Sequence, residues 1–179
     1  PVKLHIDAMS AMGAKINIED GYIKASVNGR LKGNKISFDP VSVTGTENVI
    51  MAATLAEGIT TIQNAAKEPE VVDLVNCLIN MGAKIKGAGS DTIEIEGVDS
   101  LTGTSFSVMP DRVEVGTYLA ATAMTGGHVK IKSAKPEYLS SVITKLESSG
   151  AKIYTGEDWA ELKLEINRPI SKSVTTGPY

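Results

Sequence analysis

The pentapeptide MGAKI occurs at Met12–Ile16 and again at Met81–Ile85, and a close variant, SGAKI, occurs at Ser149–Ile153. The three glycines of these stretches are 69 and 68 residues apart. Other sequence repeats in the same register, since AATLAEG at Ala52–Gly58 matches AATAMTGG at Ala120–Gly127. A period of this length predicts a repeated unit of about two helices and four strands, which is larger than the usual small solenoid repeats.

Each repeat carries the signal of a helix that ends at its glycine. The apolar residues of Val71–Met81 fall on one helical face, and those of residues 139–146 do the same one period later. A glycine can adopt the left-handed conformation that closes a helix, so we expect both helices, and a third over Val2–Met12, to end at the glycines of the repeat. The two apolar faces consist of Val71, Val75, Leu78 and Ile79, and of Leu139, Val142, Ile143 and Leu146.

Strand signals follow the helices. The tripeptide AKI is predicted to open a strand in all three copies, and Thr60–Gln63 and His128–Lys132 are predicted strands that leave the preceding helices. Thr92–Glu96 alternates apolar and charged residues, as a strand with one solvated face does. The middle unit is therefore predicted to run helix, strand, helix and then three strands. This pattern indicates an α/β repeat domain with its helices buried in the middle.

Composition and charge exclude several classes of protein. The chain has 179 residues, with 18 basic and 21 acidic side chains interspersed along it, for a formal charge of −3. A nucleic-acid binder needs a concentrated basic face and a membrane span needs an apolar run of about eighteen residues, so we expect neither a nucleic-acid nor a membrane partner. Two histidines and one cysteine are too few for a usual zinc site or a disulfide framework. Because the sequence starts at Pro1 without methionine, we expect a fragment of a longer protein.

Two helix starts have residues that either cap the helix or bind an anion. Thr44 and Glu47 have the spacing of a capping box, and Asp111 and Glu114 occupy a similar place one repeat later. The structural interpretation is that two repeats cap the same helix in the same way. The functional interpretation is that backbone N–H groups left free at the first helix start bind a phosphate. The sequence leaves both interpretations open.

Two other features have a structural and a chemical interpretation. KEPE at Lys67–Glu70 places two carboxylates at a helix start, where the helix dipole stabilises them or where they form an acid/base pair in a cleft. Cys77 lies in the middle of a helix between apolar residues, so we expect a buried core residue with an unreactive thiol.

Six strings closely resemble UDP-N-acetylglucosamine enolpyruvyl transferases, and the resemblance extends from Pro1 to Tyr179. They are, in order, VKLHI, KASVNGRLKGNKISF, PVSVTGTENVIMAATLAEG, NAAKEPEVVDLVNCLINMGAKI, MPDRVEVGTYLAA and TGEDW. In that family six βαβαββ units form two lobes, and each lobe is an inverse α/β barrel with its helices inside. The resemblance implies that residues 1–109 form the later part of the first lobe and residues 110–179 the start of the second.

The resemblance also implies a reaction. Such enzymes move the enolpyruvyl group of phosphoenolpyruvate to the 3′-hydroxyl of UDP-N-acetylglucosamine and release phosphate, by addition and elimination through a tetrahedral intermediate. This is the committed step of bacterial peptidoglycan synthesis. The family needs no metal or organic cofactor, and we expect a cytoplasmic location.

Site residues are carried over from the resemblance position by position. The family's reactive cysteine, its phosphoenolpyruvate-binding residues and its proposed base match no position here, so we expect no catalytic residue in this chain. Lys3 stands where many relatives have Asp, and Pro40 where many have Lys. Contacts to UDP-N-acetylglucosamine are expected from Pro1, Val2, Lys3, Leu4, Pro40, Val41, Ser42 and Val43, and positions near the cleft are His5, Glu68, Glu70, Asp111 and Arg112.

Two alternatives remain at this point. The first is 5-enolpyruvylshikimate-3-phosphate synthase, which shares fold and chemistry with the resembled family but fits the quoted strings much less well. The second is a non-catalytic repeat scaffold or clamp, against which the interspersed charge argues.

Overall fold

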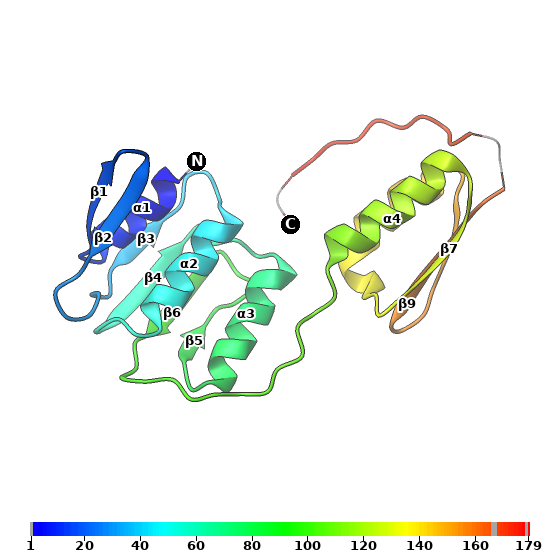
Figure 1. Cartoon of the computed structure of the whole chain (residues 1–179). Coiled ribbons are helices and arrows are strands. Elements are labelled where there is room, and N and C mark those ends of the chain that lie inside the picture. The colour runs from blue at the N-terminus through cyan, green and yellow to red at the C-terminus, as the bar shows by residue number, and fades with distance from the viewer. Residues whose placement is uncertain (1, 166–167, 178) are drawn as a thin grey trace. The chain divides into compact units, whose positions relative to one another are not determined.

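The computed structural model describes residues 2–165, 168–177 and 179, and it divides into two compact units. The first unit comprises the described residues up to Ser107 together with Tyr179, and the second comprises Val108–Gly177 (Figure 1). Within these described residues, none of the helices is both long and apolar enough to cross a bilayer.

The first unit begins with the end of one repeat and continues with a complete one. The opening elements are α1 (Lys3–Ala11), β1 (Lys15–Glu19) and β2 (Tyr22–Ser26). The complete repeat consists of β3 (Lys35–Ser37), α2 (Val43–Ala53), β4 (Ile59–Gln63), α3 (Pro69–Asn80), β5 (Lys84–Lys86) and β6 (Thr92–Glu96). The second unit consists of α4 (Arg112–Thr125), β7 (Gly127–Lys132), a 3₁₀ turn η1 (Pro136–Leu139), α5 (Ser140–Ser148), β8 (Lys152–Thr155) and β9 (Trp159–Leu164).

The sheets of the two units have equivalent strand arrangements. In the first, the strand order is β3-β4-β6-β5, with β3 parallel to β4 and the other pairs antiparallel. In the second, the order is β7-β9-β8, so β7, β9 and β8 take the places of β4, β6 and β5. β1 and β2 form an antiparallel hairpin equivalent to β5 and β6.

The three repeated glycines close three helices with the same geometry. Gly13, Gly82 and Gly150 have φ angles of +97°, +103° and +96°, a left-handed conformation that only glycine adopts at little cost. In each copy the glycine N–H and the following alanine N–H donate to carbonyls of the last helical turn, at 2.9–3.2 Å. Strands β1, β5 and β8 then begin two residues after the glycine. The prediction that the repeats begin equivalent strands is confirmed.

The core of the first unit lies between its helices and one face of its sheet. Val49 and Ile50 of α2 are completely buried, as are Ile62, Ile93 and Ile95 of the sheet. The alternate residues of β6, Glu94 and Glu96, are exposed, which confirms the strand with one solvated face. Helix α2 lies between α1 and α3 and contacts both (Figure 1).

The second unit has a smaller core, formed by α4, η1 and the inner face of β9. Leu119, Leu139 and Leu162 are its fully buried leucines among the described residues. Helix α5 packs Ile143 and Leu146 against this core but has no fully buried residue.

Several details differ from the sequence prediction. Ile79 is 43% exposed and Cys77 is only half-buried, so both were wrongly assigned to the buried face of α3. That face instead contains Val71, Val75 and Leu78 together with the partly buried Leu74.

The prediction of a third strand at the end of the middle unit is also wrong. Residues 97–111 form neither a helix nor a strand. The equivalent strand β3 exists because it pairs with β4. Within the described residues, β7 has no such neighbour and is an edge strand.

Candidate functional site

The predicted site residues lie at the amino-terminal ends of four helices. Val2 precedes α1, Ser42 precedes α2, Glu68 precedes α3, and Asp111 precedes α4. Pro1 lies outside the described residues. A helix start leaves backbone N–H groups without an intrahelical acceptor and carries a partial positive charge, so each is a place where an acceptor or an anion is stabilised.

Three of these helix starts come together in the first unit. Because β3, β4 and β5 are mutually parallel, the connecting helices α2 and α3 run in the same direction and start at the same end of the sheet. Helix α1 joins them, since His5 Nδ1 lies 2.7 Å from Asn48 Nδ2 on α2. We call residues Val2–His5, Pro40–Asn48 and Glu68–Glu70 the helix-start cluster. Asp111 and Arg112 belong to the second unit.

Ser42 is the cap of α2, and its geometry corrects the predicted capping box. The Gly45 N–H donates to Ser42 Oγ at 3.1 Å, and the Thr46 N–H donates to the Ser42 carbonyl at 2.9 Å. Thr44 is already inside the helix, so the Thr44–Glu47 capping box was wrong. The N–H groups of Val43 and Thr44 have no acceptor among the described residues. They remain available for an acceptor outside the protein.

The loop before α3 is tied to the same helix start. Thr46 is completely buried; its hydroxyl donates to the Ser42 carbonyl at 2.8 Å and accepts the Ala66 N–H at 3.1 Å. Gly45 is required by close packing, because a Cβ there would lie 2.9 Å from both Phe38 Cε1 and Ser42 Oγ. The start of α2 is therefore a rigid element of the cluster.

Three apolar members of the cluster turn their side chains inward, whereas Val2 is 53% exposed. Leu4, Val41 and Val43 are partly buried and pack against the first core. The Lys3 ammonium pairs with Asp7 one turn along its own helix, at 2.5 Å. At these four positions a ligand would therefore meet backbone groups more than side chains.

Three carboxylates lie at the side of the cluster formed by α2 and α3. Partial burial raises the pKa of the Glu47 carboxyl, and the nearby carboxylates of Glu70 and Glu68 raise it further. Glu47 is therefore close enough to the start of α3 for its charge to interact with the carboxylates there. The group can hold a proton more easily than an ordinary glutamate, or accept hydrogen bonds from a polar ligand.

The start of α4 is closed by a charged cap. The Val113 and Glu114 N–H groups donate to Asp111 Oδ1 at 2.8 and 3.1 Å. The prediction that Asp111 caps this helix is confirmed, but Glu114 makes no reciprocal bond to the Asp111 N–H. Because a carboxylate already occupies this helix start, a second anion gains less from it.

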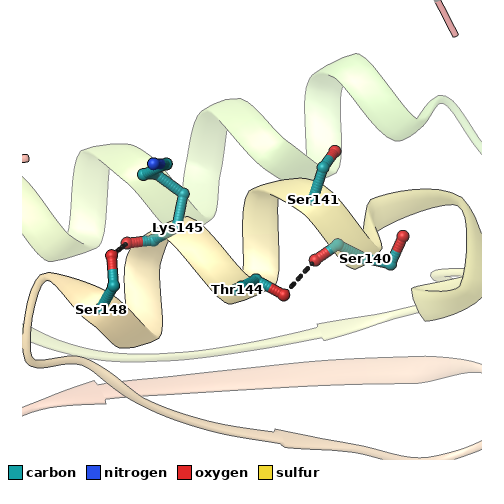
Figure 2. Close-up of a pocket in the computed structure, with 5 residues that line it drawn as sticks. All are labelled: Ser140, Ser141, Thr144, Lys145 and Ser148. Atoms are coloured by element: carbon teal, nitrogen blue, oxygen red, sulfur yellow. Dashed lines mark hydrogen bonds between the residues drawn. The ribbon is translucent and has the colours of Figure 1, made fainter. Parts of the chain in front are cut away.

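A cavity of about 440 Å³ lies on the outer side of α5 (Figure 2). Two of its polar groups are directed at the helix itself, because Thr144 Oγ1 donates to the Ser140 carbonyl at 2.9 Å and Ser148 Oγ to the Lys145 carbonyl at 2.7 Å. Lys145 Nζ donates to the Ser173 carbonyl at 3.0 Å. Since most of its donors are already used within the protein, this cavity is a weaker candidate than the helix-start cluster.

Comparison with known proteins shows the family of the chain. The model of the EPSP synthase (3-phosphoshikimate 1-carboxyvinyltransferase) family matches residues 1–179. The chain belongs to the EPSP synthase family. Within the family, it is 56% identical over all its 179 residues to proteins named UDP-N-acetylglucosamine 1-carboxyvinyltransferase from Shewanella sp. (strain ANA-3) and Shewanella putrefaciens. It covers 43% of the length of each.

Two solved structures share the fold. The enolpyruvyl transferase NikO from Streptomyces tendae is 21% identical with a TM-score of 0.78, and the match covers 92% of this chain and 42% of that one. An EPSP synthase from Acinetobacter baumannii is 21% identical with a TM-score of 0.65, over 91% and 39% of the two chains. These likenesses confirm the predicted α/β fold class.

The sequence prediction missed two members of the cluster, Glu47 as a neighbour of the α3 carboxylates and Asn48 as a partner of His5. Asn48 and His5 are 43 residues apart, so no local pattern connects them. Only the packing of α1 against α2 brings them into contact.

Proposed function

We propose that this chain is part of an enzyme that transfers the enolpyruvyl group of phosphoenolpyruvate to the 3′-hydroxyl of UDP-N-acetylglucosamine. The observation that carries the proposal is the 56% identity, over the whole chain, to proteins named for that activity. The convergence of the two predicted contact segments with the predicted cleft residues Glu68 and Glu70 in the helix-start cluster supports it.

We assign to the cluster part of the surface that binds UDP-N-acetylglucosamine. The nucleotide sugar carries a diphosphate, which the positive ends of α1 and α2 would stabilise. The Val43 and Thr44 N–H groups are suitable donors, and the neutral cap Ser42 adds no repelling charge. In this proposal Lys3 and Pro40 contribute through their backbones, because Lys3 is paired with Asp7 and proline has no charge.

The proposed reaction has two steps. The 3′-hydroxyl gives its proton to a base as its oxygen bonds to C2 of phosphoenolpyruvate, while C3 gains a proton. C3 then loses a proton as the C2–O bond to phosphate breaks and phosphate leaves. Both steps need the substrates held in register, and a misplacement of about 1 Å can cost a hundredfold in rate. We place the groups that activate phosphoenolpyruvate outside this chain, which therefore binds one substrate without turnover.

The wider arrangement is also a proposal. We place residues 1–109 in the first lobe and residues 110–179 in the second, with Glu68, Glu70, Asp111 and Arg112 near the cleft between the lobes. We place the reaction in the bacterial cytoplasm, with the two phosphorylated small molecules as substrates, no nucleic-acid or membrane partner, and no cofactor.

The test is phosphate release by a complete protein that contains this chain. We expect release from phosphoenolpyruvate with UDP-N-acetylglucosamine and none with shikimate 3-phosphate, while the 179-residue chain alone gives neither. Release with shikimate 3-phosphate would instead support an EPSP synthase, and no release with either acceptor would support a scaffold. Turnover by the chain alone would contradict the placement of the catalytic groups outside it.

A further inference from the structure

We propose that Asn48 is a positioning residue of the nucleotide-sugar surface, because its side-chain amide fixes the tautomer and the orientation of the His5 imidazole. The ligand in this inference rests on the proposed function, whereas the contact rests on geometry. Asn48 Nδ2 on α2 lies 2.7 Å from His5 Nδ1 on α1. Among the described residues, this contact is the only side-chain hydrogen bond between α1 and α2.

The chemistry of the two groups determines the direction of this bond. An amide nitrogen has only N–H donors, so Nδ1 of the neutral imidazole must accept. The ring proton then resides on Nε2. His5 therefore presents an N–H donor on the side of the ring away from Asn48.

The position of the His5 ring places its Nε2–H donor beside the first predicted contact segment. His5 is the third residue of α1, and its backbone N–H donates to the Val2 carbonyl at 3.1 Å, so the ring belongs to the turn that contains Val2–Leu4. Its side chain is half-buried, which limits its other orientations. A fixed N–H donor here suits an acceptor oxygen of a nucleotide sugar, and its orientation is set before the ligand binds.

Two consecutive residues of α2, Glu47 and Asn48, interact with two different helices. Successive helical residues point about 100° apart. Glu47 is close to Glu68 and Glu70 at the start of α3, while Asn48 reaches α1. Asn48 thus holds the first turn of α1 in place relative to the α2 cap, and both segments of the proposed surface depend on that arrangement.

The experiment compares three variants of the 179-residue chain by NMR of the histidine ring nitrogens and by titration with UDP-N-acetylglucosamine. Asn48→Asp replaces the donor with an acceptor, so Nδ1 of His5 should become protonated. Asn48→Ala removes the donor, and we expect affinity to fall about three- to tenfold. The control is Asn76→Ala, which makes the same change at an exposed position of α3 and should alter neither quantity.

The outcomes separate the inference from the proposed function. If the native chain binds the nucleotide sugar but Asn48→Asp leaves Nδ1 unprotonated and Asn48→Ala leaves the affinity unchanged, the inference is overturned and the proposed function stands. If the tautomer responds as expected but the native chain shows no saturable binding, the ligand assignment is overturned together with the proposed function. A changed tautomer together with weaker binding supports both.

Discussion

The chain contains the same helix start twice, once in each unit, and closes it in two different ways. Helix α2 begins shortly after Pro40 and is capped by the neutral Ser42, which accepts one backbone N–H. Helix α4 begins shortly after Pro110 and is capped by the carboxylate of Asp111, which accepts two. The repeat therefore determines where the helix starts, and the cap residue determines whether that start can still stabilise an anion.

A carboxylate in each unit has a shifted pKa, and the two shifts have opposite directions. Glu47 lies beside Glu70 and Glu68, and its pKa is raised by partial burial and by these charges. Glu161 on β9 accepts a hydrogen bond from His128 at 2.7 Å and lies near Lys163, and these contacts lower its pKa. The first unit concentrates like charges at its candidate site, whereas the second pairs its carboxylate on the outer face of a sheet.

The largest expected difference between the units is in their response to core truncation. Leu119 of α4 and Ile50 of α2 are both completely buried, so either change to alanine should cost about 2–5 kcal/mol. The second core has nine buried apolar residues and the first has eighteen among those described. Segment-resolved hydrogen exchange should therefore show Leu119→Ala unfolding the second unit alone. Joint loss of protection in both units would contradict their independence.

Matched glycine substitutions should have opposite signs in the two helices. A Cβ at Gly45 would lie 2.9 Å from Phe38 and Ser42, so Gly45→Ala should destabilise by about 1–3 kcal/mol. At Gly116 the nearest atom would be 3.6 Å away, an ordinary contact, and alanine should stabilise α4 by up to about 1 kcal/mol. Thermal unfolding of both variants measures this, and a shift in the same direction would contradict the packing described.

Replacing Thr60 by valine, the residue at the equivalent position of the second unit, should stabilise the first unit. The Thr60 hydroxyl is buried without a hydrogen-bond partner among the described residues. The strand registers pair Thr60 with Ile95 and Val129 with Leu162, so Val129 occupies the equivalent position. Thr60→Val should therefore raise the free energy of unfolding by about 1 kcal/mol in a urea titration. Destabilisation would show that the hydroxyl has a role in the native state.

The smallest expected effect is a pH dependence of opposite sign for two glutamates. A raised pKa in the folded state means that Glu47 destabilises once pH rises through that pKa, so Glu47→Gln should stabilise at pH 7 and lose this effect below the ordinary value of 4.5. The pKa of Glu161 is lowered, so its contribution is present above the ordinary value and is lost as pH falls through the folded pKa. Glu161→Gln should therefore destabilise at pH 7. Urea unfolding of the two variants and of the native chain, at pH 7 and below pH 4.5, measures these effects. Equal responses of the two variants would contradict the difference in environment between Glu47 and Glu161.

The repeat and its periodicity predicted most of the fold, because glycine closure and apolar spacing are local properties. The three strands after Gly13, Gly82 and Gly150 were correct for this reason. The cap of α2 was placed two residues too late, because Ser42 and Thr44 both suit a cap and only the path of the chain selects between them. The contact of Asn48 with His5 was beyond prediction, since it depends on the packing of two helices.

The most direct test of the account is an NMR titration of the 179-residue chain with UDP-N-acetylglucosamine, observing backbone amides. We expect the amides of Val2–Leu4 and Val41–Thr44 to shift, and those at the start of α4 to shift less. Ser42→Asp, which keeps a cap but places a negative charge at this helix start, should weaken the binding about tenfold without destabilising the fold. Shifts confined to other regions, or equal binding by Ser42→Asp, would contradict the claim that the open start of α2 is part of the nucleotide-sugar surface.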